Sequence, residues 1–258
     1  MTTSTAPDPF AEYAATAVEF TDPSACPLDL QMATFFGRSG TGKTSVAAAF
    51  ENHIYLDLEA SATEHKIAAW PWGKTWAKFE ELIELTAKHK GGPLEGKTLI
   101  IDPVSELWEM CLRHELAERK LDALPDDYGR TLVAIRQRFG RTMQRLLRLR
   151  MEQRMGTIFI AHEVVTEEVT PTDRIVKYEP KAGDKWVSAW IAEKAQMILR
   201  FSIEDRDPLT GKAWADGQSP KWVIRTKPLN ASDVVKDRTE RLPPFVLARH
   251  DKLVAAYG

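Results

Sequence analysis

An eight-residue glycine-rich motif, Gly-Arg-Ser-Gly-Thr-Gly-Lys-Thr at residues 37–44, constrains the fold of this 258-residue chain more than any other feature. It follows an apolar run at 32–36 that suits a buried strand, and it precedes a run at 45–50 that suits a helix. Glycines in such a loop let successive backbone N–H groups point inward around a phosphate, at a helix start whose dipole favours anions. The motif therefore predicts a strand–loop–helix unit that binds a nucleoside triphosphate.

The motif also predicts a role for its last two side chains. Lys43 would reach the β- and γ-phosphates, and the Thr44 hydroxyl would ligate magnesium. The expected phosphate-binding residues are Gly37, Arg38, Ser39, Gly40, Thr41, Gly42, Lys43, Thr44 and Ser45. A chance glycine-rich turn is the alternative, and the complete motif between a strand-like and a helix-like run argues against it.

Composition excludes several classes of protein. A hydrophobic content of 43% suffices for a core, and the formal net charge of −2 excludes a uniformly basic protein. The two cysteines, Cys26 and Cys111, show neither a disulfide pattern nor metal-ligand spacing with the six histidines. The start lacks a signal peptide and no apolar run approaches the ~20 residues of a membrane span. We therefore expect a soluble cytoplasmic protein, in the host cytoplasm if phage-encoded.

Strand-like and helix-like segments alternate along the chain. Strands are expected at 53–59, 98–102 and 156–162, and helices at 76–90, 103–119 and 131–154. This order predicts an α/β fold with a mainly parallel central sheet and helices on both faces. Paired strands at 197–203 and 221–226 predict an antiparallel extension near the C-terminus.

The same patterns predict the boundaries of the domain. Residues 1–27 are rich in Thr, Ala, Pro and Asp and are expected to form a flexible N-terminal arm. The core is expected over 28–228, followed by a polar C-terminal tail at 229–258 with a short last helix. Residues 163–187 show no sustained period, so we expect a long loop there.

Three polar residues end the predicted strands, and the ends of parallel strands meet at one rim of a sheet. Asp102 is the expected partner of magnesium, although it could instead be an ordinary carboxylate at a helix start. Glu59 is the candidate base for the attacking water, with Asp57 as its competitor. His162 is the candidate sensor of the γ-phosphate, or a structural histidine. The candidate catalytic residues are thus Glu59, Lys43 and His162, and the candidate metal ligands are Thr44 and Asp102.

The segment 130–154 carries eight Arg and one Glu. Arg138, Arg141, Arg145 and Arg148 recur at helical spacing and form one stripe, opposite an apolar stripe. Solvated helix faces usually interleave Glu at four-residue spacing, which is missing here, so the stripe favours a phosphate-backbone or acidic-partner surface. An Arg of this helix, or a basic residue of 163–187 (Arg174, Lys181 or Lys185), could instead reach a neighbouring subunit's γ-phosphate. Tyr178, Trp186 and Trp190 could stack on bases or belong to the core.

Four segments together resemble the RecA-like P-loop ATPases, most closely the phage-encoded single-domain members of the single-strand annealing and recombination type. They are the motif at 37–44, Tyr-Leu-Asp-Leu-Glu at 55–59, Leu-Ile-Ile-Asp at 99–102 and Thr-Ile-Phe-Ile-Ala-His at 157–162. The resemblance implies magnesium-dependent hydrolysis of ATP, with Glu59 activating water, and assembly into a ring or filament. It also implies contact with single-stranded DNA through 163–187, beside 120–130, and a single-strand-binding protein as a further partner. The segment 163–187 carries six acidic and four basic residues, which weakens a DNA contact made through it alone.

Two other functions remain compatible with the sequence. One is a nucleotide-gated assembly or regulatory ATPase that does not use DNA. The other is a small-molecule kinase, against which the Glu59 strand end argues.

Overall fold

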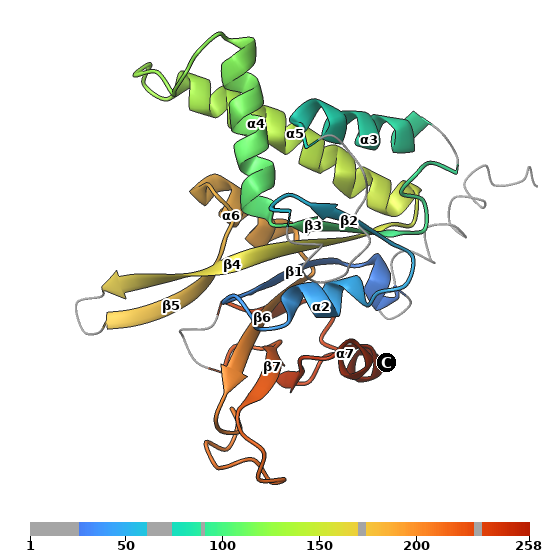
Figure 1. Cartoon of the computed structure of the whole chain (residues 1–258), viewed down its shortest axis with the longest axis vertical. Helices are drawn as coiled ribbons and strands as arrows, with labels where there is room; N and C mark the ends of the chain where they lie inside the picture. Colours follow the sequence, from blue (N-terminus) through green and yellow to red (C-terminus); the bar gives the residue numbers. More distant parts are fainter. Residues whose placement is uncertain (1–25, 61–73, 89–90, 170–173, 230–233) are drawn as a thin grey trace, which may run out of the picture.

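The computed structural model describes residues 26–60, 74–88, 91–169, 174–229 and 234–258 (Figure 1). A short 3-10 helix, Leu28–Leu30, precedes the first strand. The strands are β1 (Met32–Gly37), β2 (His53–Asp57), β3 (Thr98–Asp102), β4 (Gly156–Val169), β5 (Arg174–Lys181), β6 (Met197–Glu204), β7 (Lys221–Arg225), β8 (Lys236–Asp237) and β9 (Phe245–Leu247). The α-helices are α2 (Lys43–Ala48), α3 (Trp76–Lys88), α4 (Val104–Glu118), α5 (Arg130–Glu152), α6 (Lys185–Lys194) and α7 (His250–Tyr257). The expected arm lies almost wholly outside the described residues.

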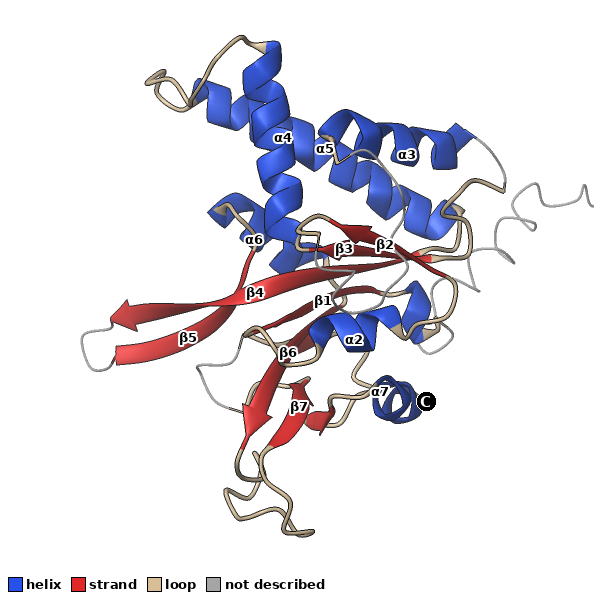
Figure 2. Cartoon of the chain, in the orientation of Figure 1, coloured by secondary structure: helices blue, strands red, loops and turns tan. Residues whose placement is uncertain are grey.

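The strands form one twisted sheet in the order β2-β3-β4-β1-β6-β7-β9 (Figure 2). Neighbours from β2 to β6 are parallel, whereas β7 pairs antiparallel with β6 and β9 antiparallel with β7. The predicted α/β fold, with a mainly parallel sheet and an antiparallel extension, is confirmed. Strand β4 lies between β1 and β3, so the loop after β1 and the end of β3 face each other across one intervening strand.

Alternate residues of the buried strands supply two apolar cores, one on each face of the sheet. Leu99 and Ile101 of β3 pack with α3, α4, α5 and α6, whereas Ile100 packs with α2 and α7 on the other face. Helix α3 buries Trp76, Phe79, Leu82, Ile83 and Thr86, the residues that its periodicity predicts. Helices therefore cover both faces, as expected (Figure 1).

The expected long loop at 163–187 is wrong. Strand β4 continues through Val169 and pairs antiparallel with β5, and the chain then enters α6. The two strands project from the body of the domain as a hairpin (Figure 2). From Val164 onward the residues of β4 are half-buried or exposed on both faces, so no apolar alternation marks this part of the strand.

Residues 234–258, which belong to the tail expected at 229–258, contribute to the sheet and to its core. Strand β8 pairs with β6 and β9 pairs with β7. Helix α7 buries Leu253 and Tyr257 against the face that also carries α2. The expected short last helix is thus present at the C-terminus.

One arginine of the stripe on α5, Arg138, makes ion pairs inside the protein. Arg138 lies 2.8 Å from Glu80 of α3 and 2.8 Å from Glu115 of α4, and it also contacts Glu118 at 2.7 Å. Although burial opposes it, hydrogen bonding from Arg138 holds the pKa of Glu115 below its usual range. The acidic partners come from other helices, so Arg138 joins three helices rather than forming an open polyanion surface.

Replacing Arg138 should destabilise the protein. We expect Arg138→Ala to lower the free energy of unfolding by about 2 kcal/mol, because Glu115, whose side chain is 10% exposed, would lose its main partner. Urea unfolding followed by circular dichroism measures this change.

Arg113→Ala is the matched control. Arg113 pairs with Glu106 at 3.6 Å and its side chain is 66% exposed, so its loss should cost less than about 1 kcal/mol. Equal losses for the two variants would contradict a structural role for Arg138.

Candidate functional site

The glycine-rich motif joins the end of β1 to the start of α2, as predicted. Gly37 lies so close to β6 that a Cβ atom there would sit 2.2 Å from the carbonyl oxygen of Phe201, and only glycine fits. Gly40 and Gly42 adopt φ angles of 77° and 90°, a left-handed conformation that favours glycine. The loop thus leads into the N-terminus of α2, which begins at Lys43 and whose first N–H groups can bind an anion.

Lys43 is folded back onto the loop. Its Nζ donates hydrogen bonds to the carbonyl oxygens of Gly37 at 3.0 Å and Arg38 at 2.8 Å. Burial lowers the pKa of Lys43, and the carboxylates of Asp102, Glu163 and Glu59 oppose this shift. An anion bound in the loop would add a direct charge partner to this ammonium group, whose hydrogen bonds go to carbonyl oxygens.

A side-chain hydrogen bond links the loop to β3. The Thr44 hydroxyl donates to Oδ2 of Asp102 at 2.9 Å, and the hydroxyl of Tyr55 on β2 contacts the same oxygen. Burial raises the pKa of Tyr55, and the negative charge of Asp102 adds to this effect. The two hydroxyls fix the Asp102 carboxylate at the rim of the sheet.

These residues fit a magnesium ion held jointly with a nucleotide. The Thr44 hydroxyl donates its hydrogen bond to Asp102 and keeps its oxygen lone pairs for a cation. Magnesium prefers oxygen ligands and usually binds through one or two protein groups, substrate phosphates and water. Among the described residues there is no cluster of three or more acidic, His or Cys side chains that could hold a metal ion.

Glu59 and His162 meet beside this pair. Glu59 follows the end of β2, and its Oε2 lies 3.6 Å from Nε2 of His162 on β4. Both side chains are partly exposed, at 43% and 44%. Asp57, the competitor of Glu59, is 7% exposed, so Glu59 is the more accessible carboxylate at this strand end.

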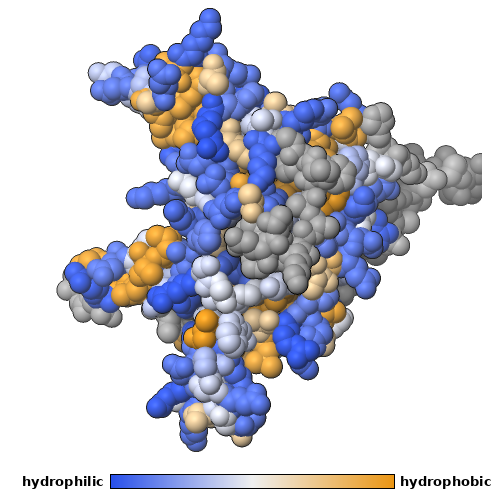
Figure 3. Space-filling model, viewed as in Figure 1, coloured by the Kyte–Doolittle hydropathy of each residue, from blue (hydrophilic) through white to orange (hydrophobic). Residues whose placement is uncertain are grey.

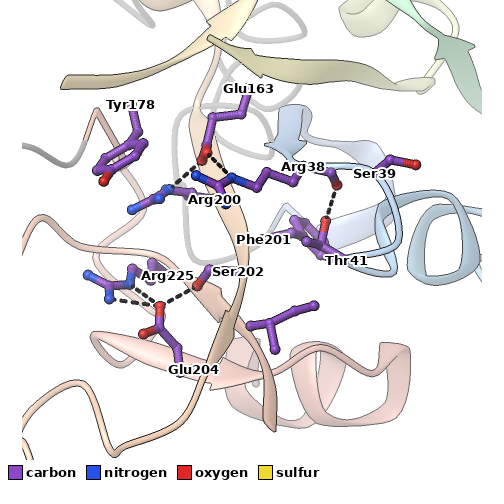
Figure 4. A pocket seen from close by; sticks show the side chains of 11 residues that line it. Arg38, Ser39, Thr41, Glu163, Tyr178, Arg200, Phe201, Ser202, Glu204 and Arg225 are labelled. Carbon is purple, nitrogen blue, oxygen red and sulfur yellow. Dashed lines mark hydrogen bonds and ion pairs between the residues drawn. The ribbon is translucent and has the colours of Figure 1, made fainter. Parts of the chain in front are cut away.

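The described residues also contain a cavity of about 530 Å³ between the motif and β6 (Figure 4). Glu163, next to His162, spans the cavity wall: its carboxylate lies 3.4 Å from Arg38 of the motif and 2.7 Å from Arg200 of β6. The Arg200 guanidinium lies 3.8 Å from the centre of the Tyr178 ring. The Glu163 side chain is only 2% exposed. Its ion pair with Arg38 joins the motif to the base of the hairpin.

The structure brings the sequence-predicted residues of the motif, Glu59, Asp102 and His162 to one rim of the sheet. Cα registers pair Gly37 with His162 and Asp57 with Asp102 at the carboxyl ends of these strands. Sequence reasoning missed Tyr55 and Glu163. A tyrosine inside a buried strand needs a hydrogen-bond partner for its hydroxyl. This requirement could have predicted from the sequence that Tyr55 contacts a polar residue of the rim.

Comparison with known proteins assigns the chain to a family. A family described as an AAA domain matches residues 30–239. The chain belongs to the AAA domain family. It is therefore a nucleotide-binding ATPase domain with a P-loop, as the glycine-rich motif predicts.

One solved structure similar to this AAA domain is a KaiC-like protein from the hyperthermophilic archaeon Pyrococcus horikoshii. The two are 16% identical over 76% of this chain and 78% of that chain, with a TM-score of 0.38. No match is found among the curated proteins. Within the described residues, no helix is long and apolar enough to span a membrane.

Removing the Tyr55 hydroxyl should loosen Asp102. We expect Tyr55→Phe to keep the fold but to raise the magnesium concentration needed for half-maximal nucleotide binding several-fold, because Asp102 loses a hydrogen bond worth about 1 kcal/mol. Titration of magnesium at fixed ATP, followed by calorimetry, measures this shift.

Tyr178→Phe is the matched control, since the Tyr178 ring faces Arg200 and not Asp102. A magnesium requirement that rises equally in both variants, or in neither, would count against the assigned role of Tyr55.

Proposed function

We propose that this AAA domain is a magnesium-dependent ATPase that acts on single-stranded DNA. The observation that carries the ATPase part is the assembly of Thr44, Asp102, Glu59 and His162 at one rim, with contacts of 2.9 Å and 3.6 Å within the two pairs. Hydrolysis needs groups that hold the phosphates and a group that orients water, and this rim offers both. A bare anion-binding loop needs no such pair of a carboxylate and an imidazole.

In this proposal each side chain has one task. The backbone of the motif and Lys43 bind the phosphates, while Thr44 and Asp102 hold magnesium, which would neutralise charge on the phosphates. Glu59 orients the attacking water and accepts its proton. His162, which contacts Glu59, senses the γ-phosphate.

Two features favour single-stranded DNA as a partner: the resemblance of the sequence to phage-encoded RecA-like ATPases, and the basic helix α5. The chain has a formal net charge of −2, yet eight arginines lie within 130–154. A local cationic surface on a mildly acidic protein suits a polyanion bound at one place. We further propose a homo-oligomer, in a ring or filament, that works in recombination or annealing.

Glu59→Gln should keep nucleotide binding and lose turnover. We expect hydrolysis to fall at least 100-fold, within the range of general-base catalysis, while the ATP dissociation constant changes less than about threefold. Lys43→Ala should instead weaken binding itself. Calorimetry and a phosphate-release assay separate the two effects.

Glu51→Gln, at an exposed position after α2, is the control for charge loss. Normal hydrolysis by Glu59→Gln would overturn the base assignment and make Asp57 the next candidate.

Single-stranded DNA should stimulate ATP hydrolysis by the purified protein. DNA binding should weaken as salt rises, because the phosphate contacts are electrostatic. A protein that hydrolyses ATP but neither binds DNA nor responds to it would support a nucleotide-gated assembly ATPase instead. Phosphate transfer to a small molecule would support a kinase.

A further inference from the structure

The stripe on α5 contains two kinds of arginine. Arg138 and Arg145 pair with acidic residues of neighbouring helices, Arg145 with Glu84 of α3. Arg141 and Arg148, seven residues apart, are exposed, and within the described part of the chain neither has an ion-pair or hydrogen-bond partner. Seven residues correspond to about 10 Å along a helix, so these two charges lie in one line on one face.

A groove runs along these two arginines. It encloses about 770 Å³, and its lining includes Arg141, Arg145, Arg148 and two tryptophans of α6, Trp186 and Trp190. Glu152 is the acidic side chain of that lining. Glu84, which pairs with Arg145, also pairs with Lys88 at 3.5 Å. The groove therefore combines a cationic excess with aromatic rings.

The ring of Trp186 is held against α5 by specific contacts. A Cβ atom on Gly140 would lie 2.9 Å from the Trp186 ring, so a glycine inside this helix lets the ring approach. Glycine at such a position costs about 1 kcal/mol relative to alanine. Asp184 accepts a hydrogen bond from the backbone of Trp186 at 2.8 Å and also pairs with Arg136 of α5 at 2.8 Å. The half-buried ring is thus fixed in place at the groove.

We propose that this groove between α5 and α6 binds single-stranded nucleic acid. Arg141 and Arg148 contact successive phosphates of one strand, and Trp186 stacks on a base. Cationic side chains that follow the backbone, combined with an aromatic platform, are the features by which proteins bind single strands without reading their sequence. This inference rests on the proposed function and assigns the DNA partner to a surface.

The hairpin of β4 and β5 is less suited to this role. Two of the three basic side chains of β5 pair with acidic ones of β4, Arg174 with Glu167 at 3.4 Å and Lys177 with Glu168. It also exposes apolar side chains, including Val165 at 50% and Val169 at 71%, and an apolar patch is visible on it in Figure 3. Cations that already pair with carboxylates, and exposed valines, bind a phosphate backbone weakly. Arg141 and Arg148 are exposed and free to contact phosphates.

The test is binding of a labelled oligo-dT strand, followed by fluorescence anisotropy over a range of salt concentrations. We expect Arg141→Ala/Arg148→Ala to weaken binding at least tenfold and to reduce the slope of log affinity against log salt by about 1.4. Trp186→Phe should weaken binding severalfold without changing that slope, because it alters stacking and not charge. Neither variant should change ATP hydrolysis measured without DNA.

The matched control is Arg249→Ala/Lys252→Ala, which removes two exposed charges at α7 on the opposite face of the sheet. If the groove variant binds DNA as tightly as this control, the assigned surface is wrong while the proposed function stands. If the wild-type protein does not bind DNA, the DNA part of the proposed function fails and the groove assignment fails with it.

A second probe separates nucleic acid from an acidic protein. Poly-glutamate carries repeated charges but no bases, so the wild-type protein should bind it more weakly than oligo-dT at the same salt concentration. Equal affinity for both, with Trp186→Phe unchanged, would overturn the proposal in favour of an acidic protein partner.

Discussion

The hydrogen bond from Thr44 to Asp102 is the interaction on which the site depends. It joins the loop after β1 to the end of β3 across the intervening strand β4. Parallel pairing brings the ends of these strands to one rim. His162 on β4 and Glu59 after β2 therefore lie beside the loop and contact each other. Tyr55 and the close approach of Gly37 to Phe201 hold the two ends of this arrangement in place.

Local patterns predicted most of the parallel sheet and of the rim. Apolar runs marked β1 and β3, and 3.6-residue spacing marked α3, because burial on a fixed face imposes those periods. The hairpin escaped prediction because β4 leaves the core after His162, where burial no longer imposes a pattern. Partners of Arg138 lie on α3 and α4, far away in sequence, and no spacing rule within α5 could reveal them.

The two faces of the sheet differ in their contents. The face with α2 and α7 supports the phosphate-binding loop, and the face with α3 to α6 contains the arginine-rich helix. Glu163 connects them at the rim, since it follows His162 and pairs with both Arg38 and Arg200. The base of the hairpin is thereby joined to the loop through the buried Glu163 carboxylate, for which loss of Arg200, the closer and more buried partner, is the more costly.

A double-mutant cycle on Thr44 and Asp102 is the most direct test of a magnesium site that the two residues share. ATP affinity is measured by calorimetry in magnesium and in a chelator. If the two residues hold the ion together, the double variant Thr44→Val/Asp102→Asn will lose little more magnesium-dependent affinity than the worse single variant. The loss in the double variant will then fall short of the sum of the two single losses by more than about 1 kcal/mol. The coupling should disappear in the chelator. Additive losses in magnesium, or equal coupling in both conditions, would contradict a shared metal site built on this hydrogen bond.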